Sequence, residues 1–165
     1  MPDQLARQWP SVREMVERGR RSAGHVTIAS VDAAGGPTIT PIGTVFLRAD
    51  GTGFYFDQYT ERLAENLDAN PQVCVMAVDR GTGFWLRSLL TGRFHKPIGV
   101  RLYGTAGPRR LATADELDEV DRRVRLMRIT RGGRRLWSDF SYVRDLVFTD
   151  CRWVQYPVMM PALNG

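Results

Sequence analysis

Short hydrophobic runs in the first half of the chain alternate with polar residues, as half-buried β-strands do. Residues 25–31 alternate in this way, and residues 38–47 form a second such run beyond a turn rich in Gly and Ala. The pair Asp50-Gly51 predicts a tight turn into an aromatic strand at residues 54–56. These runs predict a meander of antiparallel strands.

A segment whose apolar residues have helical spacing follows these strands. Thr60 is a good N-cap, and Leu63 and Leu67 lie on one face of the helix that would follow it. This helix should end near Asn70, because the next residue is a proline, which disfavours helical backbone before it. Residues 73–78 predict a further strand, so that two strands flank the helix.

Two more helices are predicted, one near each end of the chain. Pro10 or Ser11 begins a short helix that Gly19 ends. The second, predicted to be the longest, starts with a capping box at residues 113–116 and stops at residues 131–135. Its apolar positions have helical spacing: Leu117, Val120, Val124 and Met127. Further strands are predicted at residues 100–106 and 146–155.

The segment at residues 80–98 is too apolar for a plain solvated loop. It is interrupted by Gly and Pro, and its large apolar residues are Phe84, Trp85, Leu86, Leu89, Leu90 and Phe94. An apolar segment of this kind usually packs over a ligand or over another protein surface. It would line a ligand cleft, pack on a second subunit or make an excursion into the core, and the sequence leaves these three interpretations open.

The order of these elements predicts one small, mostly antiparallel β-barrel with peripheral helices. A chain of 165 residues with 43% hydrophobic and 25% charged residues suits a single domain over residues 1–165. Its core would span residues 24–156, and the prolines at 157 and 161 make residues 157–165 a C-terminal arm.

The sequence gives little evidence for a targeting segment or for a metal site. The charged N-terminus and the lack of a long apolar stretch predict a cytoplasmic protein that does not enter the membrane. Cys74 and Cys151 are expected to be reduced and buried. With His25 and His95 as the two histidines and no ligand spacing around them, no metal site is expected.

Positive charge is concentrated in the C-terminal third. The net charge is +5, from 23 basic and 18 acidic residues. The arginines of this third include Arg109, Arg110, Arg122, Arg123, Arg125, Arg128, Arg131, Arg134 and Arg135. Nucleic acid, an acidic small molecule or a subunit contact would each suit this charge, and a solvated helix face is the default.

Two features suggest a ligand site. A helix start exposes unpaired N–H groups and a partial positive charge, and Thr60 and Arg62 would add a hydroxyl and a guanidinium, so a phosphate would dock there. Thr60 would otherwise be only a helix cap. Pro41 and Gly43 suggest an edge or bulge that a ring system approaches, or else a barrel corner without a ligand.

The chain resembles the FMN-binding split β-barrel family of pyridoxamine 5′-phosphate oxidase over residues 24–107. The resemblance rests on a strand, a polar turn, a basic helix start and a following strand, together with the segments at residues 38–43 and 100–106. The matching residues of the central unit are Tyr55-Phe56, Arg62, Asn66-Leu67, Asn70-Pro71 and Val73.

This resemblance implies a homodimeric flavoprotein, with FMN in the groove between subunits and an oxidoreductase activity on a small molecule. The flavin would carry the chemistry, and no catalytic side chain is assigned. The implied FMN contacts are the backbone of Thr40, Pro41, Ile42 and Gly43 for the ring, Phe56 and Asp57 for the ribityl chain, Thr60 and Arg62 for the phosphate, and Trp85 or Trp153 of the other subunit over the ring.

The chain departs from the family pattern at the helix start. Family members usually carry a small hydroxyl residue, Arg and Lys there, whereas this chain has Glu61, Arg62 and Leu63. Because Glu61 would repel a phosphate, a split barrel that binds deazaflavin F420 or haem is an alternative. A non-enzymatic nucleic-acid-binding module that uses the C-terminal arginines is another.

Overall fold

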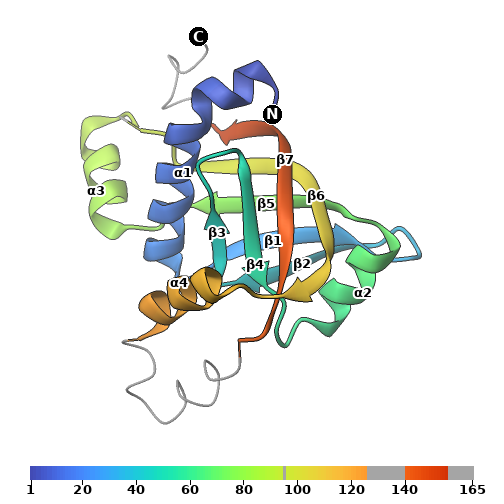
Figure 1. The fold of residues 1–165 in the computed structure, drawn as a ribbon. Helices are drawn as coiled ribbons and strands as arrows, with labels where there is room; N and C mark the ends of the chain where they lie inside the picture. The colour runs from blue at the N-terminus through green and yellow to red at the C-terminus, as the bar shows by residue number, and fades with distance from the viewer. Residues whose placement is uncertain (95, 126–139, 156–165) are drawn as a thin grey trace.

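Seven strands form one antiparallel sheet that curls into a half-barrel (Figure 1). The computed structural model describes residues 1–94, 96–125 and 140–155. The strands are β1 (Val26–Val31), β2 (Pro37–Ile42), β3 (Val45–Leu47), β4 (Thr52–Phe56), β5 (Gln72–Val78), β6 (Gly99–Leu111) and β7 (Tyr142–Val154). The helices of the described residues are α1 (Asp3–Ala23), α2 (Glu61–Ala69), α3 (Thr82–Thr91) and α4 (Ala114–Val124). This split barrel with peripheral helices confirms the predicted fold class.

The predicted strand at residues 38–47 is in fact two strands at opposite edges of the sheet. The strand order is β2-β1-β5-β6-β7-β4-β3, so that β2 pairs with β1 and β3 pairs with β4. The alternation of hydrophobic and polar residues continues through Gly43 and Thr44. It therefore does not show where the chain leaves one neighbouring strand and begins to pair with another. Pro41 lies in the edge strand β2, as predicted, where its missing N–H removes no bond on the open side.

Helix α1 corrects the prediction of a short helix from Pro10 or Ser11 to Gly19. It starts at Asp3, contains Pro10 and ends before Gly24, whose φ is 81°. The glycine at 19 does not stop the helix but packs on β5, where an added Cβ would lie 3.0 Å from the backbone nitrogen of Val78. With 21 residues α1 is also longer than the 11 described residues of α4, so the expectation for the longest helix is wrong for the described chain.

Two of the three hydrophobic clusters of the described residues lie on opposite faces of the sheet near its β4–β3 edge. The larger of the two fills the half-barrel and includes Val75, Leu102 and Leu146 from the sheet together with Trp9 and Val12 from α1. The smaller of the two holds three phenylalanines of β3 and β4 against α4; its buried members are Phe46, Phe54, Phe56, Val120, Val124 and Val143. Strand alternation explains this division, because neighbouring side chains of β4 point to opposite faces.

Three predicted helix boundaries agree with the structure. Thr60 precedes α2, Asn70 follows it, and a capping box joins Thr113 and Glu116 at α4. Strands β6 and β7 are longer than expected and bend at register shifts near Gly104. Met127, Trp137, the predicted stop at 131–135 and the arm at 157–165 lie outside the described residues.

Candidate functional site

A pocket of about 350 Å³ opens where β2 ends and α2 begins. Three separate segments of the chain form it: the link from β2 to β3, the turn from β4 to α2, and the residue two before β7. The lining residues are Thr40, Pro41, Ile42, Gly43, Thr44, Phe56, Gln58, Tyr59, Thr60 and Phe140. Its volume is in the range of small-molecule sites.

Six of the nine residues predicted to contact a cofactor line this pocket. They are Thr40, Pro41, Ile42, Gly43, Phe56 and Thr60. Asp57 is buried behind the lining, and Arg62 is exposed on α2. Trp85 lies on α3, where its Nε1 donates to the carbonyl of Asp79 at 2.8 Å. The structure therefore gathers the expected ring residues with Phe56 and Thr60 but not Arg62, and all cofactor contacts stay predictions.

Thr60 does not cap α2 with its side chain. Its hydroxyl donates to Oδ1 of Asp57, and no side-chain cap bond is made at this helix start. The first N–H groups of a helix have no partner within the helix itself. The start of α2 therefore keeps donors that a ligand at the pocket can use, together with the positive end of the helix dipole.

Arg144 holds Asp57 in place, and sequence reasoning missed it. Its Nε lies 2.8 Å from Oδ2 of Asp57, and its Nη1 lies 2.8 Å from Oδ1 of Asp68 on α2. Arg144 is 2% exposed and Asp57 is 5% exposed. Neighbouring carboxylates raise the pKa of Arg144 against the opposing effect of burial, so it stays charged. The sequence carried no signal for this role, because a buried arginine and a solvated one look alike in a strand.

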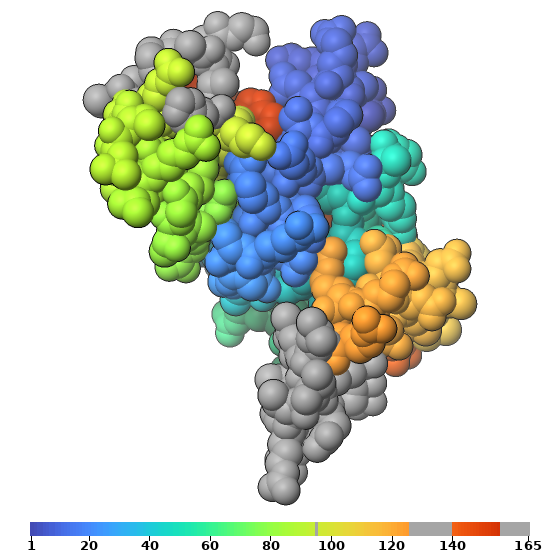
Figure 2. Space-filling view, turned by 90° about the vertical axis from the view of Figure 1, so that its left-hand side faces the viewer, coloured from blue at the N-terminus to red at the C-terminus, as the bar shows by residue number. Residues whose placement is uncertain are grey.

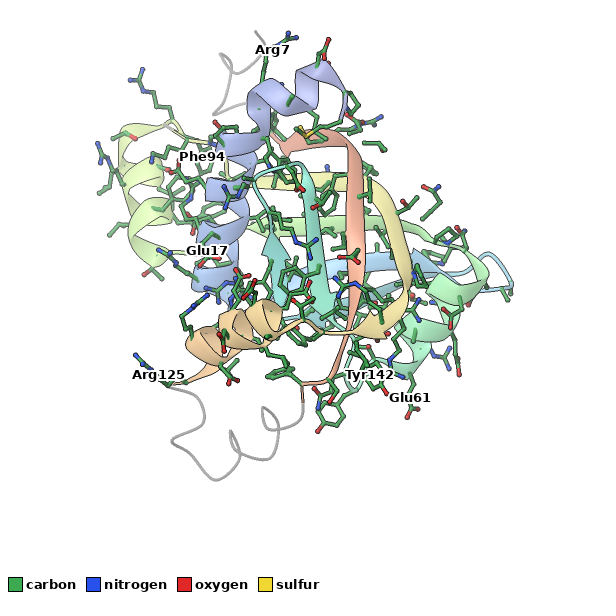
Figure 3. All side chains as sticks on the ribbon, in the orientation of Figure 1. Arg7, Glu17, Glu61, Phe94, Arg125 and Tyr142 are labelled. Atoms are coloured by element: carbon green, nitrogen blue, oxygen red, sulfur yellow. The ribbon has the colours of Figure 1, made fainter. Side chains whose placement is uncertain are left out.

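The first three residues of α2 differ in burial and in charge. Leu63, where the family usually has Lys, is 1% exposed and belongs to the barrel core. Glu61 and Arg62 are both exposed, and Glu61 lies at the outer surface on the same side as Tyr142 (Figure 3). An anion bound here would meet backbone donors and one guanidinium, opposed by one carboxylate.

Two features of the turn before α2 are unusual in a folded protein and make it a candidate ligand contact. Oε1 of Gln58 is buried and has no hydrogen-bond partner, although buried acceptors are normally paired. Tyr59 has a φ of 59°, which costs a non-glycine residue roughly 1 kcal/mol, and its side chain is 70% exposed at the pocket. Unpaired acceptors and strained residues concentrate at binding sites.

Aromatic rings form one side of the pocket. Phe56 and Phe140 lie 4.8 Å apart between ring centroids, with their planes at 61°. The hydroxyl of Tyr55, on the opposite face of β4, is buried without a partner, and burial raises the pKa of this phenol. Tyr55 therefore stays neutral and does not supply a phenolate.

Arg123 of α4 anchors the link that lines the pocket. Its Nη1 donates to the carbonyl of Val45 at 2.5 Å and lies 3.5 Å from that of Gly43. Its guanidinium stacks 3.4 Å from the centroid of Phe46, and burial lowers its pKa to about 10, so it remains a cation at neutral pH. Arg122 and Arg125 are exposed, as a solvated helix face predicts, but Arg123 is not. Arg128, Arg131, Arg134 and Arg135 lie outside the described residues.

Other chemistry is limited in the described part of the chain. Among these residues, no group of three or more His, Cys, Asp or Glu side chains is arranged to hold a metal ion. None of the helices there is long and apolar enough to cross a membrane. Cys74 and Cys151 are half-buried rather than fully buried as predicted, and burial raises the pKa of both thiols.

Comparison with known proteins agrees with this geometry. A sequence model of the family described as Pyridoxamine 5′-phosphate oxidase matches residues 12–137. No curated protein matches the chain. An FMN-binding protein from Syntrophomonas wolfei subsp. wolfei is 15% identical, with a TM-score of 0.55, over 93% of this chain and 97% of that one.

Two further solved structures have the same fold but other functions. The heme storage protein HutZ from Vibrio cholerae is 17% identical, with a TM-score of 0.52, over 86% of this chain and 94% of that one. An F420 reductase is 11% identical, with a TM-score of 0.50, over 85% of this chain and 94% of that one. At these identities the similarity establishes the fold alone. Because the family match spans well over half of the chain and the sheet is the same curled half-barrel, this protein belongs to the pyridoxamine 5′-phosphate oxidase family of split β-barrels.

Proposed function

We propose that this protein binds FMN in the pocket between β2 and α2 and uses it as an oxidoreductase that acts on a small molecule. One observation carries the proposal: a single cavity is lined by Thr40 to Gly43, by Phe56 and by Thr60, the residue that precedes α2. This arrangement suits a planar ring at one end and an anion at the other.

The residues of the pocket fit the flavin better than they fit its phosphate. The Gln58 carboxamide offers an acceptor that an N–H of the ring or a hydroxyl of the ribityl chain would satisfy. At the other end, the N–H groups of α2 and the exposed Arg62 favour a phosphate, and Glu61 opposes it. When bound, FMN supplies the electron transfer, and the protein positions it.

Deazaflavin F420 is the second candidate, and the buried Leu63 favours it, since the family's usual lysine for the phosphate is missing. Haem is supported less well. The described lining residues include no His, Cys or Met, and Tyr59 is the single side chain among them of a type that ligates haem iron.

A homodimer is part of the proposal. Trp85 and Trp153 do not line the pocket of their own chain, so either would cover a bound ring only from a second subunit. Light scattering should then give twice the 18.7 kDa of one chain. A monomer that binds FMN with full affinity would overturn the shared site.

Titration of the purified protein with FMN, F420 and haemin, followed by absorbance and thermal unfolding, tests the cofactor. We expect FMN to bind and stabilise the protein most. Thr40→Trp, which fills the pocket, should abolish this binding, whereas Ile39→Trp should not, because Ile39 is 72% exposed on the other face of β2. Stabilisation by F420 or haemin but not by FMN would reassign the cofactor, and unchanged FMN binding by Thr40→Trp would exclude this pocket.

A further inference from the structure

The connection between β5 and β6 is far longer than the sheet requires. Val78 pairs with Gly99, so residues 79–98 join two antiparallel neighbours that a turn of roughly two to five residues would connect. The connection carries α3, which stands on the outer side of α1 in Figure 1. Long excursions from a compact sheet usually have a function of their own.

The inner face of α3 is fixed to the rest of the protein. Phe84 and Trp85 pack on Phe94 with ring centroids 5.7 and 5.3 Å apart, and Figure 3 shows Phe94 between α3 and α1. Arg18 of α1 lies over Phe84 at 5.6 Å and forms an ion pair of 2.8 Å with Asp79. These contacts set the direction in which the outer face of α3 points.

The outer face of α3 is a leucine surface. Leu86, Leu89 and Leu90 are 60%, 64% and 79% exposed, and their spacing of three and four residues places them on one side of the helix. Figure 2 shows the yellow-green α3 as a lobe that projects beside the blue α1. The leucine surface is thus presented at a protruding part of the molecule.

The charged residues of the excursion itself, residues 80–98, have a single sign. Residues 80–98 contain no Asp or Glu, and their basic residues are Arg80, Arg87, Arg93 and Lys96. The three arginines are exposed, and no ion pair joins their guanidinium groups to a described residue. Lys96 lies 3.3 Å from Glu14 of α1.

We propose that α3 docks the protein on anionic membrane surfaces, with the leucine surface inserted at the boundary between headgroups and acyl chains. Apolar residues on one side of a helix, flanked by arginines, are what interfacial helices use. Lipid phosphates complement Arg80, Arg87 and Arg93, and the excursion has no acidic residue that would be repelled.

A second copy of the chain suits this surface less well. A two-fold contact brings the same surface of both copies together, so the arginines of the two copies would lie in one interface to which residues 80–98 contribute no acidic residue. Three leucines also fall short of the roughly 800 Å² that each partner of a stable protein interface buries.

Sedimentation with lipid vesicles tests the proposal, and it needs no cofactor. The protein should co-sediment with vesicles of phosphatidylglycerol and phosphatidylcholine at low salt, at least tenfold more than with phosphatidylcholine alone, and high salt should weaken the binding. Thr40→Trp, with its cofactor pocket filled, should bind vesicles like the wild type. The outcome is therefore independent of the proposed FMN site.

Matched variants identify the surface. The triple change Leu86→Gln, Leu89→Gln and Leu90→Gln should abolish sedimentation and leave the thermal midpoint unchanged. Leu111→Gln is the control, since Leu111 is 68% exposed on β6, away from α3. The double change Arg87→Gln and Arg93→Gln should weaken binding to anionic vesicles severalfold.

Three results would overturn the proposal. The first is a wild-type protein that sediments with neither kind of vesicle, and the second is binding that does not depend on anionic lipid. The third is a triple leucine variant that still binds vesicles. If the triple variant instead lowers the mass in light scattering without any vesicle binding by the wild type, the leucine surface is a contact between two copies.

Discussion

Arg144 and Asp57 form a buried ion pair, with Arg144 Nε 2.8 Å from Asp57 Oδ2 and both side chains 3% exposed. The pair joins β7 to the turn that precedes α2. Asp57 also accepts a hydrogen bond from Thr60, which lines the pocket. Strand β7, which is distant in sequence but pairs directly with β4, thus fixes the helix start where a ligand would bind.

Replacement of Arg144 should therefore be costly. We expect Arg144→Met to lower the free energy of unfolding by about 3 kcal/mol, because it removes the buried cation beside Asp57 and leaves that carboxylate only the Thr60 hydroxyl and the more distant Arg109. Asp57→Asn combined with Arg144→Met should cost less than the sum of the two single changes. Urea denaturation measures all three. Arg152→Met on the same strand is the control, since that side chain is 71% exposed. Equal effects of Arg144→Met and Arg152→Met would contradict the prediction.

The unpaired Oε1 of Gln58 should lower the stability of the ligand-free protein and strengthen ligand binding. Gln58→Leu removes a buried oxygen that has no partner, so we expect a gain of about 1 kcal/mol in the free energy of unfolding. The same variant should bind FMN roughly fivefold to tenfold more weakly, because it loses one hydrogen bond to the ligand. Gln72→Leu, at an exposed position of β5, should change neither property. An undiminished FMN affinity of Gln58→Leu would show that the amide is not a ligand contact, and a less stable variant would show that its oxygen has a partner within the protein.

Glu61 should weaken the binding of a phosphate in particular. A carboxylate a few ångströms from a phosphate repels it by about 1 kcal/mol at a partly wet site, so Glu61→Gln should raise the affinity for FMN roughly fivefold. Riboflavin has the same ring without the phosphate, and its affinity should not change. Fluorescence titration with both ligands makes the comparison, and Glu65→Gln, exposed one turn further along α2, is the control. An equal gain for riboflavin would place the phosphate elsewhere.

The network around Glu116 should make stability depend on pH. Hydrogen bonds from Arg110 hold the pKa of Glu116 and that of Asp145 below their ordinary values, and Arg48 contacts both carboxylates. A pKa that is lowered on folding stabilises the fold above the ordinary value, here 4.5 for Glu116, and this contribution is lost as the pH falls through the folded pKa.

Glu116→Gln should therefore cost about 1 to 3 kcal/mol at pH 7 and progressively less in acid, where the wild type loses the same charge. Glutamine retains a capping-box side chain, so the helix cap is preserved. Denaturant unfolding at a series of pH values measures the difference, with Asp118→Asn at an exposed position of α4 as the control. A difference that stays constant down to pH 3 would exclude the charge as its cause.

Local patterns predicted the elements whose signals lie within one turn or strand. The N-cap Thr60, the proline after Asn70 and the capping box at Thr113 each mark a boundary that the structure has at the same residue or next to it. The apolar spacing of Leu5, Trp9 and Val12 was also available, and the prediction failed there because a proline inside the helix was interpreted as its start.

The sequence by itself determined most of the strands, both limits of α2 and the start of α4, because burial and capping leave signals in neighbouring residues. Only the tertiary structure decided that residues 37–42 and 45–47 lie at opposite edges of the sheet, that Arg144 is buried while Arg152 is solvated, and that Gln58 has an unpaired oxygen. These outcomes depend on which distant segments meet when the sheet closes. Side chains of the same type then differ through their surroundings, which no local pattern records.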